Sequence, residues 1–268
     1  MSGIPIIRSI AQIERQYNTG ELPVLVNCSD GDAYICKYMR SSGSSFKLAN
    51  ELIGAMMAQQ WELTSPAFAF VMIEPEHWAR IFTPHSLSAP AIGYKQIKRV
   101  ADINTSTYMT VKPTESILEQ ILKIALFDCW IANEDRTINN SNLLYNAKSE
   151  ELISIDYGGI LNTGSFDFPM SELTLSDSIL YADIFRHIIK DIDTTLVRNK
   201  AHNLSAYYDN CIKRCASQTD IILSIIPTEW KVPTLAIQNK LEQLFAKEWV
   251  ERVWENYIEC INETLSYE

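Results

Sequence analysis

The segment from residue 115 to residue 132 constrains the fold more than any other part of the chain. Its side chains are apolar on nearly all sides of a helix: Ile117, Leu118, Ile121, Ile124, Leu126, Phe127, Trp130 and Ile131. Thr114 precedes them and can cap a helix N-terminus, so we predict a helix over 115–132. A helix that is apolar all round is typically buried. We therefore place this helix inside a lobe of the protein.

A polar loop follows this helix directly, with the sequence Asn133-Glu134-Asp135-Arg136-Thr137-Ile138-Asn139-Asn140. Two short apolar runs come next, Leu143-Leu144-Tyr145 and Leu152-Ile153-Ser154-Ile155, with a polar turn between them. These runs predict two short strands. Asn140 would then precede the first strand, and Asp156 would follow the second.

Asp135, Asn140 and Asp156 form a pattern that is typical of magnesium-dependent phosphoryl transfer. In kinases an Asp takes the proton of the acceptor hydroxyl, while an Asn five residues later and a second Asp before an aromatic residue and Gly hold the metal. We therefore predict that Asp135, Asn140 and Asp156 are catalytic residues. Asn140 and Asp156 are the predicted metal ligands.

The crowded loop leaves two questions open. Asn139 and Asn142 are alternatives to Asn140, because the loop holds several Asn residues in a short run. Arg136 is expected either to orient the loop or to neutralise charge near a phosphate. Asp and Asn are also typical of turns and helix caps, so the order of the parts carries the prediction.

The first third of the chain predicts a small sheet and one helix. Val24–Asn27 and Ala33–Met39 are rich in strand formers and flank Asp30-Gly31, which indicates a hairpin. A serine-rich loop precedes a predicted helix over Phe46–Trp61. Further strands are expected at Phe68–Ile73 and Ala91–Tyr94, and the rest of 74–112 is expected to be irregular.

Two charged residues of this region extend the pattern. Lys37 lies on the second hairpin strand, where its ammonium can hold the phosphates of ATP as a point charge. Glu51 lies in the next helix, where its carboxylate can pair with Lys37 and fix its direction. Each residue alone is typical of a solvated surface, but their order ahead of the Asp–Asn–Asp set indicates a nucleotide site.

The last third, from about Ser171, is predicted to be helical. Apolar residues recur every four positions and predict one core-facing amphipathic helix: Leu241, Phe245, Trp249, Val253, Tyr257 and Ile261. Strands early and helices late indicate an α+β class with two lobes and a ligand cleft between them. We predict a small mixed N-lobe over 1–95 and a mainly helical C-lobe over 96–268, which carries the catalytic and metal-binding loops.

Composition narrows the function classes. A formal net charge of −10 argues against a dedicated nucleic-acid or anionic-membrane surface. No segment approaches the roughly 20 apolar residues that span a bilayer, and the scattered cysteines suggest reduced thiols. We therefore expect a cytoplasmic protein that binds neither nucleic acid nor membrane. The chain has no phosphate-loop, dinucleotide-binding or serine-hydrolase motif.

The chain resembles the HipA-like kinases, in particular short forms without the N-terminal domain of the HipA toxins. The resemblance rests on a set of motifs: Asp30–Lys37, Leu48–Leu52, Ile92–Lys95, Asn133–Asn142, Ile155–Gly159 and Ile226–Trp230. It implies a two-lobed kinase-like fold that uses ATP and Mg²⁺ and transfers a phosphoryl group to a Ser or Thr hydroxyl of an unknown protein substrate. It also admits an antitoxin-like partner. By the same resemblance, Lys37 binds phosphate, Asp135 is the base, and Asn140 and Asp156 hold Mg²⁺.

Two departures from this family bear on activity. The turn before the Lys37 strand carries Asp30 and Asp32, which would repel phosphate, and Thr137 stands where the toxins usually have His. Backbone N–H groups, or Ser42, Gly43 and Ser44 at the next helix N-terminus, would then have to bind the phosphates. The alternative functions are a weak or inactive kinase-fold binding module and a small-molecule kinase.

Overall fold

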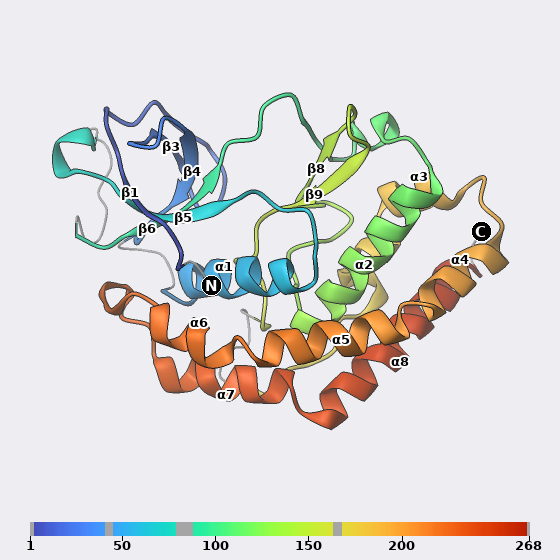
Figure 1. Cartoon of the computed structure of the whole chain (residues 1–268). Helices are drawn as coiled ribbons and strands as arrows, with labels where there is room; N and C mark the ends of the chain where they lie inside the picture. The colour runs from blue at the N-terminus through green and yellow to red at the C-terminus, as the bar shows by residue number, and fades with distance from the viewer. Residues whose placement is uncertain (1–2, 41–44, 79–87, 163–167, 267–268) are drawn as a thin grey trace.

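The computed structural model describes residues 3–40, 45–78, 88–162 and 168–266. The strands of the first third gather at one end of the molecule, and the C-terminal helices lie below and beside them (Figure 1). The α+β class predicted from the sequence is confirmed. The predicted phosphate-binding residues Ser42, Gly43 and Ser44 lie outside the described residues.

The first sheet has six strands in the order β1-β5-β6-β4-β3-β2. Their bounds are β1 (Ile6–Arg8), β2 (Arg15–Gln16), β3 (Val24–Asn27), β4 (Ala33–Lys37), β5 (Phe68–Met72) and β6 (Ala91–Lys95). The predicted hairpin is confirmed, because β3 and β4 pair antiparallel. The sequence analysis missed β1 and β2, which are short and are held by pairing with β5 and β3.

The two faces of this sheet have different surroundings. Tyr34 and Cys36 of β4 belong to a small apolar cluster with residues of β3 and β5. Successive side chains of a strand point to opposite faces. Lys37 therefore points away from that cluster and contacts Glu51 of α1 (Ser45–Gln60). The alternation that buries Cys36 thus also directs Lys37 toward the helix.

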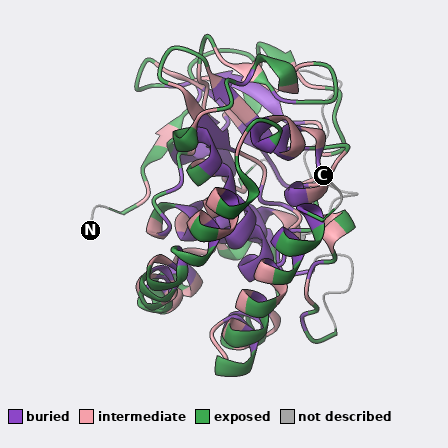
Figure 2. Cartoon of the chain, turned by 90° about the vertical axis from the view of Figure 1, so that its right-hand side faces the viewer, coloured by how far each residue is buried: buried purple, intermediate pink, exposed green. Residues whose placement is uncertain are grey.

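Helix α1 joins the sheet to the rest of the molecule. It packs against β6 on one side and against α5 (Ser205–Ala216) and α6 (Thr219–Ile225) on the other. The large apolar core contains Phe70 and Ile92 of the sheet together with residues of α1 and of the C-terminal helices. The buried residues accordingly run through the middle of the molecule (Figure 2). The lobe boundary at residue 95 stays a prediction, and the core runs across it.

Helix α2 (Glu115–Ile131) has the position and the burial that its composition predicts. The hydroxyl of Thr114 accepts a hydrogen bond from the Ile117 N–H at 3.3 Å, as a helix N-cap does. Ala132 ends the helix in the left-handed region, with φ of 51°. Most of α2 is buried, and the buried residues include one carboxylate, Asp128.

A second sheet of three strands lies next to α2. Its order is β7-β8-β9, with β7 (Ala101–Asp102), β8 (Leu143–Asn146) and β9 (Glu151–Ser154). The predicted strands β8 and β9 are confirmed as an antiparallel pair. Strand β7 was not predicted, because two residues give no alternating pattern.

The remaining helices are α3 (Asp183–Ile189), α4 (Thr194–His202), α7 (Thr234–Leu244) and α8 (Lys247–Thr264), with short 3-10 turns at Pro75–His77, Tyr108–Thr110, Leu175–Asp177, Ile179–Tyr181 and Thr228–Trp230. The prediction of one helix through residues 241–261 was wrong, because α7 ends at Leu244. The indole N–H of Trp130 donates to the Leu244 carbonyl at 3.1 Å. In a continuous helix this carbonyl would accept from the Glu248 N–H. The Leu244 carbonyl therefore accepts from Trp130 of α2 in place of the N–H that would continue α7.

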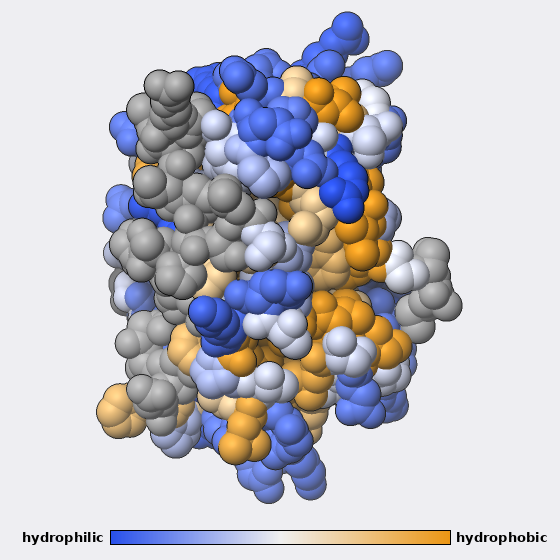
Figure 3. Space-filling model, turned by 90° about the vertical axis from the view of Figure 1, so that its left-hand side faces the viewer, coloured by the Kyte–Doolittle hydropathy of each residue, from blue (hydrophilic) through white to orange (hydrophobic). Residues whose placement is uncertain are grey.

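On the face shown in Figure 3, hydrophobic residues gather mainly on the right-hand side at mid-height, and hydrophilic residues cover much of the top and the bottom. Among the described residues, no helix has the length and apolar content that crossing a bilayer requires.

Candidate active site

Three predicted site residues meet although they lie far apart in the sequence. The Lys37 ammonium donates to Glu51 Oε1 and, at 2.6 Å, to Asp156 Oδ1. Lys37 comes from β4, Glu51 from α1, and Asp156 from the segment that follows β9. Lys37 and Glu51 are both buried, whereas the Asp156 side chain is 31% exposed. The structure therefore places one cation between two carboxylates, one of which reaches solvent.

Glu51 is held from several directions. Its Oε2 accepts hydrogen bonds from the Tyr94 hydroxyl at 2.7 Å and from the Tyr157 N–H at 3.2 Å. Burial raises the pKa of Glu51 to about 7, since the opposing effect of the Lys37 ammonium is offset in part by the Asp156 carboxylate. Burial alone would lower the pKa of Lys37, but Glu51 and Asp156 raise it above the ordinary value. Lys37 therefore stays charged at neutral pH.

Asp156 occupies an unusual backbone position, with φ of 60° in the left-handed region. This region is costly for residues with a side chain, although Asp tolerates it better than most. Burial opposes ionisation of Asp156, but Lys37 and the Gly158 N–H favour it, so its pKa is lowered below the ordinary value. An ionised, partly exposed carboxylate is the form that binds a divalent cation.

The loop after α2 holds the other two predicted residues, Asp135 and Asn140. Asp135 is exposed, and its Oδ1 accepts from Asn140 Nδ2 at 3.3 Å. Its Oδ2 and its backbone carbonyl both accept from Asn142 Nδ2, each at 3.2 Å. The carbonyl of Asn142 in turn accepts from the Ile155 N–H at 3.1 Å. Asn142 therefore links the Asp135 loop to the residue that precedes Asp156.

Gly159 brings the two groups of residues into contact. A Cβ atom at Gly159 would lie 2.6 Å from Asp135 Cβ and 3.2 Å from the Asp135 nitrogen. The Gly159 carbonyl also accepts from the Glu134 N–H at 3.0 Å. The segment after Asp156 therefore lies directly against the Asp135 loop, and only a glycine fits there.

Arg136 does not face solvent or a phosphate position. Its side chain is fully buried and pairs with Asp128 at 2.6 Å. Of the two roles that the sequence left open, charge neutralisation near a phosphate is therefore wrong. The structure supports the other role, orientation of the loop.

The acidic turn after β3 has partners within the sheet. Asp30 Oδ2 accepts from the Tyr34 hydroxyl at 2.8 Å, and Asp32 pairs with Lys95 at 2.5 Å. Lys95 neutralises one of the two negative charges. The turn therefore repels phosphate less than the sequence suggests.

Sequence reasoning assigned no site role to two residues that support these groups. Tyr94 donates to Glu51, and Asn50 Nδ2 donates to the carbonyls of Gly158 and Ile160 at 3.2 and 2.9 Å. Both residues lie in motifs of the family resemblance, which is the one signal that points to them. Their partners are far away in the sequence, so no local pattern reveals the bonds.

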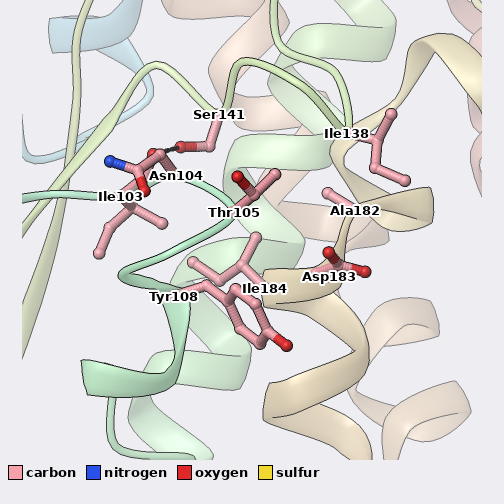
Figure 4. A pocket seen from close by; sticks show the side chains of 9 residues that line it. All are labelled: Ile103, Asn104, Thr105, Tyr108, Ile138, Ser141, Ala182, Asp183 and Ile184. Carbon is pink, nitrogen blue, oxygen red and sulfur yellow. Dashed lines mark hydrogen bonds between the residues drawn. The ribbon is translucent and has the colours of Figure 1, made fainter.

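A surface recess is lined in part by residues of the Asp135 loop (Figure 4). Ile138 and Ser141 of the loop line it, together with residues near β7 and at the start of α3: Ile103, Asn104, Thr105, Tyr108, Ala182, Asp183 and Ile184. The Ser141 hydroxyl donates to the Ile103 carbonyl and ties the loop to this wall. None of the predicted site residues lines the recess.

Comparisons with known proteins show the family and the fold of this chain. A family model described as HipA-like kinase matches residues 10–257, and the chain belongs to this family. The crystal structure of the Helicobacter pylori proinflammatory kinase CtkA aligns with a TM-score of 0.53 and 11% identity, over 98% of this chain and 99% of that chain. The Golgi casein kinase with Mn/ADP bound aligns with a TM-score of 0.48 and 12% identity, over 97% of this chain and 74% of that chain. A search of curated proteins gives no match.

The predicted family and the predicted kinase-like two-lobed fold are therefore confirmed. Family and fold identify the chain as a phosphotransferase.

Proposed function

We propose that this HipA-like kinase binds ATP with Mg²⁺ and transfers the γ-phosphoryl group to a Ser or Thr hydroxyl of a protein. One observation carries the proposal: Lys37, Glu51 and Asp156 converge, and the segment after Asp156 packs on the loop of Asp135. A phosphoryl-transfer site needs this combination, because a cation and a metal-binding carboxylate must hold the phosphates while a base takes the proton of the acceptor hydroxyl.

Lys37 is the proposed phosphate-binding cation. Its ammonium is fixed by Glu51, which is itself fixed by Tyr94 and the Tyr157 N–H. A lysine held in one position loses little freedom when it binds a phosphate. The Glu51 network therefore prepares Lys37 before the nucleotide arrives.

The donor set also fits Mg²⁺, which prefers carboxylate and amide oxygens and usually keeps several waters. Asp156 supplies a partly exposed carboxylate. Asn140 stays a predicted second ligand, but the contacts favour Asn142, the alternative that the sequence left open. Asn140 and Asn142 both use Nδ2 on Asp135, which leaves either amide oxygen for a cation, but the backbone of Asn142 is also bonded to Ile155, the neighbour of Asp156. When bound, Mg²⁺ neutralises charge on the phosphates.

Asp135 is the proposed base. Its carboxylate is exposed and is oriented by the amides of Asn140 and Asn142, so it can accept the proton of an approaching hydroxyl. The Gly159 contact sets its position relative to Asp156. Position is the first property that a general base needs.

The test compares wild type with Asp135→Asn. We expect the variant to keep its thermal stabilisation by ATP and Mg²⁺, measured against ATP with a chelator, and to lose transfer of radiolabelled phosphate to itself or to lysate proteins. Labelled Ser or Thr in protein hydrolysates would identify the acceptor. Full transfer by the variant would contradict the role of Asp135.

The alternative of a binding module predicts stabilisation by nucleotide without any transfer by the wild type. The contact between Lys37 and Asp156 favours it, because the Asp156 oxygen that accepts from Lys37 is engaged before a metal arrives. The same transfer assay separates the two functions. The antitoxin-like partner and the cytoplasmic location stay predictions.

A further inference from the structure

Arg136 lies beside the proposed base but points the opposite way. Asp135 is exposed, whereas the guanidinium of Arg136 is fully buried. Burying a charged pair costs free energy, and a well-packed apolar pair of similar volume is often as stable. Stability alone therefore does not explain why a charged pair lies under the catalytic loop.

The guanidinium donates hydrogen bonds to three residues on two different segments. Its Nη1 donates to Asp128 Oδ1 of α2 at 2.6 Å. Its Nη2 donates to the Ser154 hydroxyl at 2.7 Å and to the Ile155 carbonyl at 3.0 Å. Ile155 directly precedes Asp156. One side chain on the Asp135 loop is therefore bonded both to the buried helix and to the strand end that carries Asp156.

Asn133 strengthens the link to α2. Its Nδ2 donates to the same Asp128 oxygen at 3.0 Å, and its Oδ1 accepts from the Asp135 N–H at 3.3 Å. Asp128 thus holds the Asp135 loop through two routes, one on either side of Asp135 in the sequence. Both routes end on a helix that is rigid because it is buried.

Two atoms of the pair stay without a hydrogen bond although they are buried, Asp128 Oδ2 and Arg136 Nε. Buried polar atoms without partners are costly. A pair arranged for stability alone would satisfy these atoms. The guanidinium instead uses its two terminal nitrogens to reach acceptors on different segments, which a lysine cannot do because its ammonium is a single point.

We propose that Arg136 is a positioning residue, bonded between Asp128 and the Ser154–Ile155 backbone, that sets the distance from the base Asp135 to the metal-binding Asp156. This inference rests on the proposed function. It adds a residue that touches neither nucleotide nor acceptor and acts through the placement of two others.

The experiment uses Arg136→Lys, which keeps the charge next to Asp128 and removes the fork. Arg214→Lys is the matched control. Arg214 lies in α5, outside the site, and its guanidinium also contacts a backbone carbonyl (Gln60) and a carboxylate (Glu62). Ser154→Ala removes one acceptor of the fork and serves if Arg136→Lys does not fold. For each variant, kcat and KM for ATP are measured with hydrogen exchange of peptides over residues 133–142 and 154–160.

We expect Arg136→Lys to lower kcat by about 100-fold, because displacement of a catalytic group by about 1 Å costs that much. KM for ATP should change by less than about threefold, and exchange should rise within the two peptides and nowhere else. Ser154→Ala should act in the same direction with about a tenfold loss. The Arg214 variant should match wild type in every measurement.

A wild-type kcat in a folded Arg136→Lys or Ser154→Ala variant overturns the proposal, as does a rise in exchange across the whole chain. If the wild type shows no transfer, the proposed function fails, and the exchange measurement decides the positioning role by itself. Unchanged exchange in the two peptides would then overturn it.

Discussion

Replacement of Gly159 by alanine tests whether the Asp135 loop and the Asp156 segment form one site. An added Cβ would lie 2.6 Å from Asp135 Cβ. Carbon atoms in contact are separated by about 3.5–4.0 Å, so the loop must move by about 1 Å. The φ of Gly159 lies outside the left-handed region, so alanine adds a contact and no backbone strain.

The displaced atom is the Cβ of Asp135, which is attached directly to the backbone and is not a flexible side-chain end. Its shift therefore moves the carboxylate as well. We expect transfer to fall about 100-fold and the free energy of unfolding to fall by about 1–3 kcal/mol. Phosphate transfer from labelled ATP and thermal unfolding measure the two effects. Nucleotide stabilisation should remain, because Lys37 and Asp156 are not in the clash.

Gly20→Ala is the matched control, since an added Cβ at Gly20 has no atom within 4 Å. It should leave transfer and stability unchanged. Wild-type transfer by a folded Gly159→Ala variant would refute the reasoning, because it would mean that the loop can shift without harm or that Asp135 does not act at this position.

Three further predictions concern the Lys37 network. Asp156→Asn should lose the Mg²⁺-dependent part of ATP stabilisation, about 2.7 kcal/mol at 100 times the Kd; equal melting shifts with Mg²⁺ and with chelator in wild type and variant alike would contradict this. The raised pKa of Glu51, about 7, gives stability that is fully present below its unfolded value near 4.5 and lost as pH rises through 7. In urea titrations, the free energy of unfolding of wild type, relative to that of Glu51→Gln, should therefore fall by about 3 kcal/mol between pH 5 and pH 8. The same pH dependence in both proteins would exclude this role of Glu51. Gly54→Ala should destabilise the fold by about 1–3 kcal/mol, because its Cβ would lie 2.3 Å from Tyr157 Cβ; an unchanged melting temperature would show that α1 can move away from Tyr157.

The sequence by itself determined the elements whose signals lie within a few residues. The apolar residues of α2 repeat on all sides and Thr114 caps them, so the helix and its burial follow from local spacing. The strands β3, β4, β8 and β9 follow in the same way from short apolar runs around turns. The order of Lys37, Glu51, Asp135, Asn140 and Asp156 predicted a kinase-like site, and the motifs that resemble the HipA-like kinases predicted the family, which the family match confirms.

Only the tertiary structure decided how these residues are used. Lys37 bonds to Asp156, 119 residues away, and Trp130 ends α7 at Leu244, 114 residues away. A periodic pattern contains no information about such partners, which is why α7 and α8 read as one helix. The same holds for Arg136, because the sequence left open whether it orients the loop or neutralises charge near a phosphate, and only its buried partner Asp128 decides between them. Local spacing fixes an element because its bonds lie within it, whereas a site is fixed by contacts between elements, and these depend on how the whole chain packs.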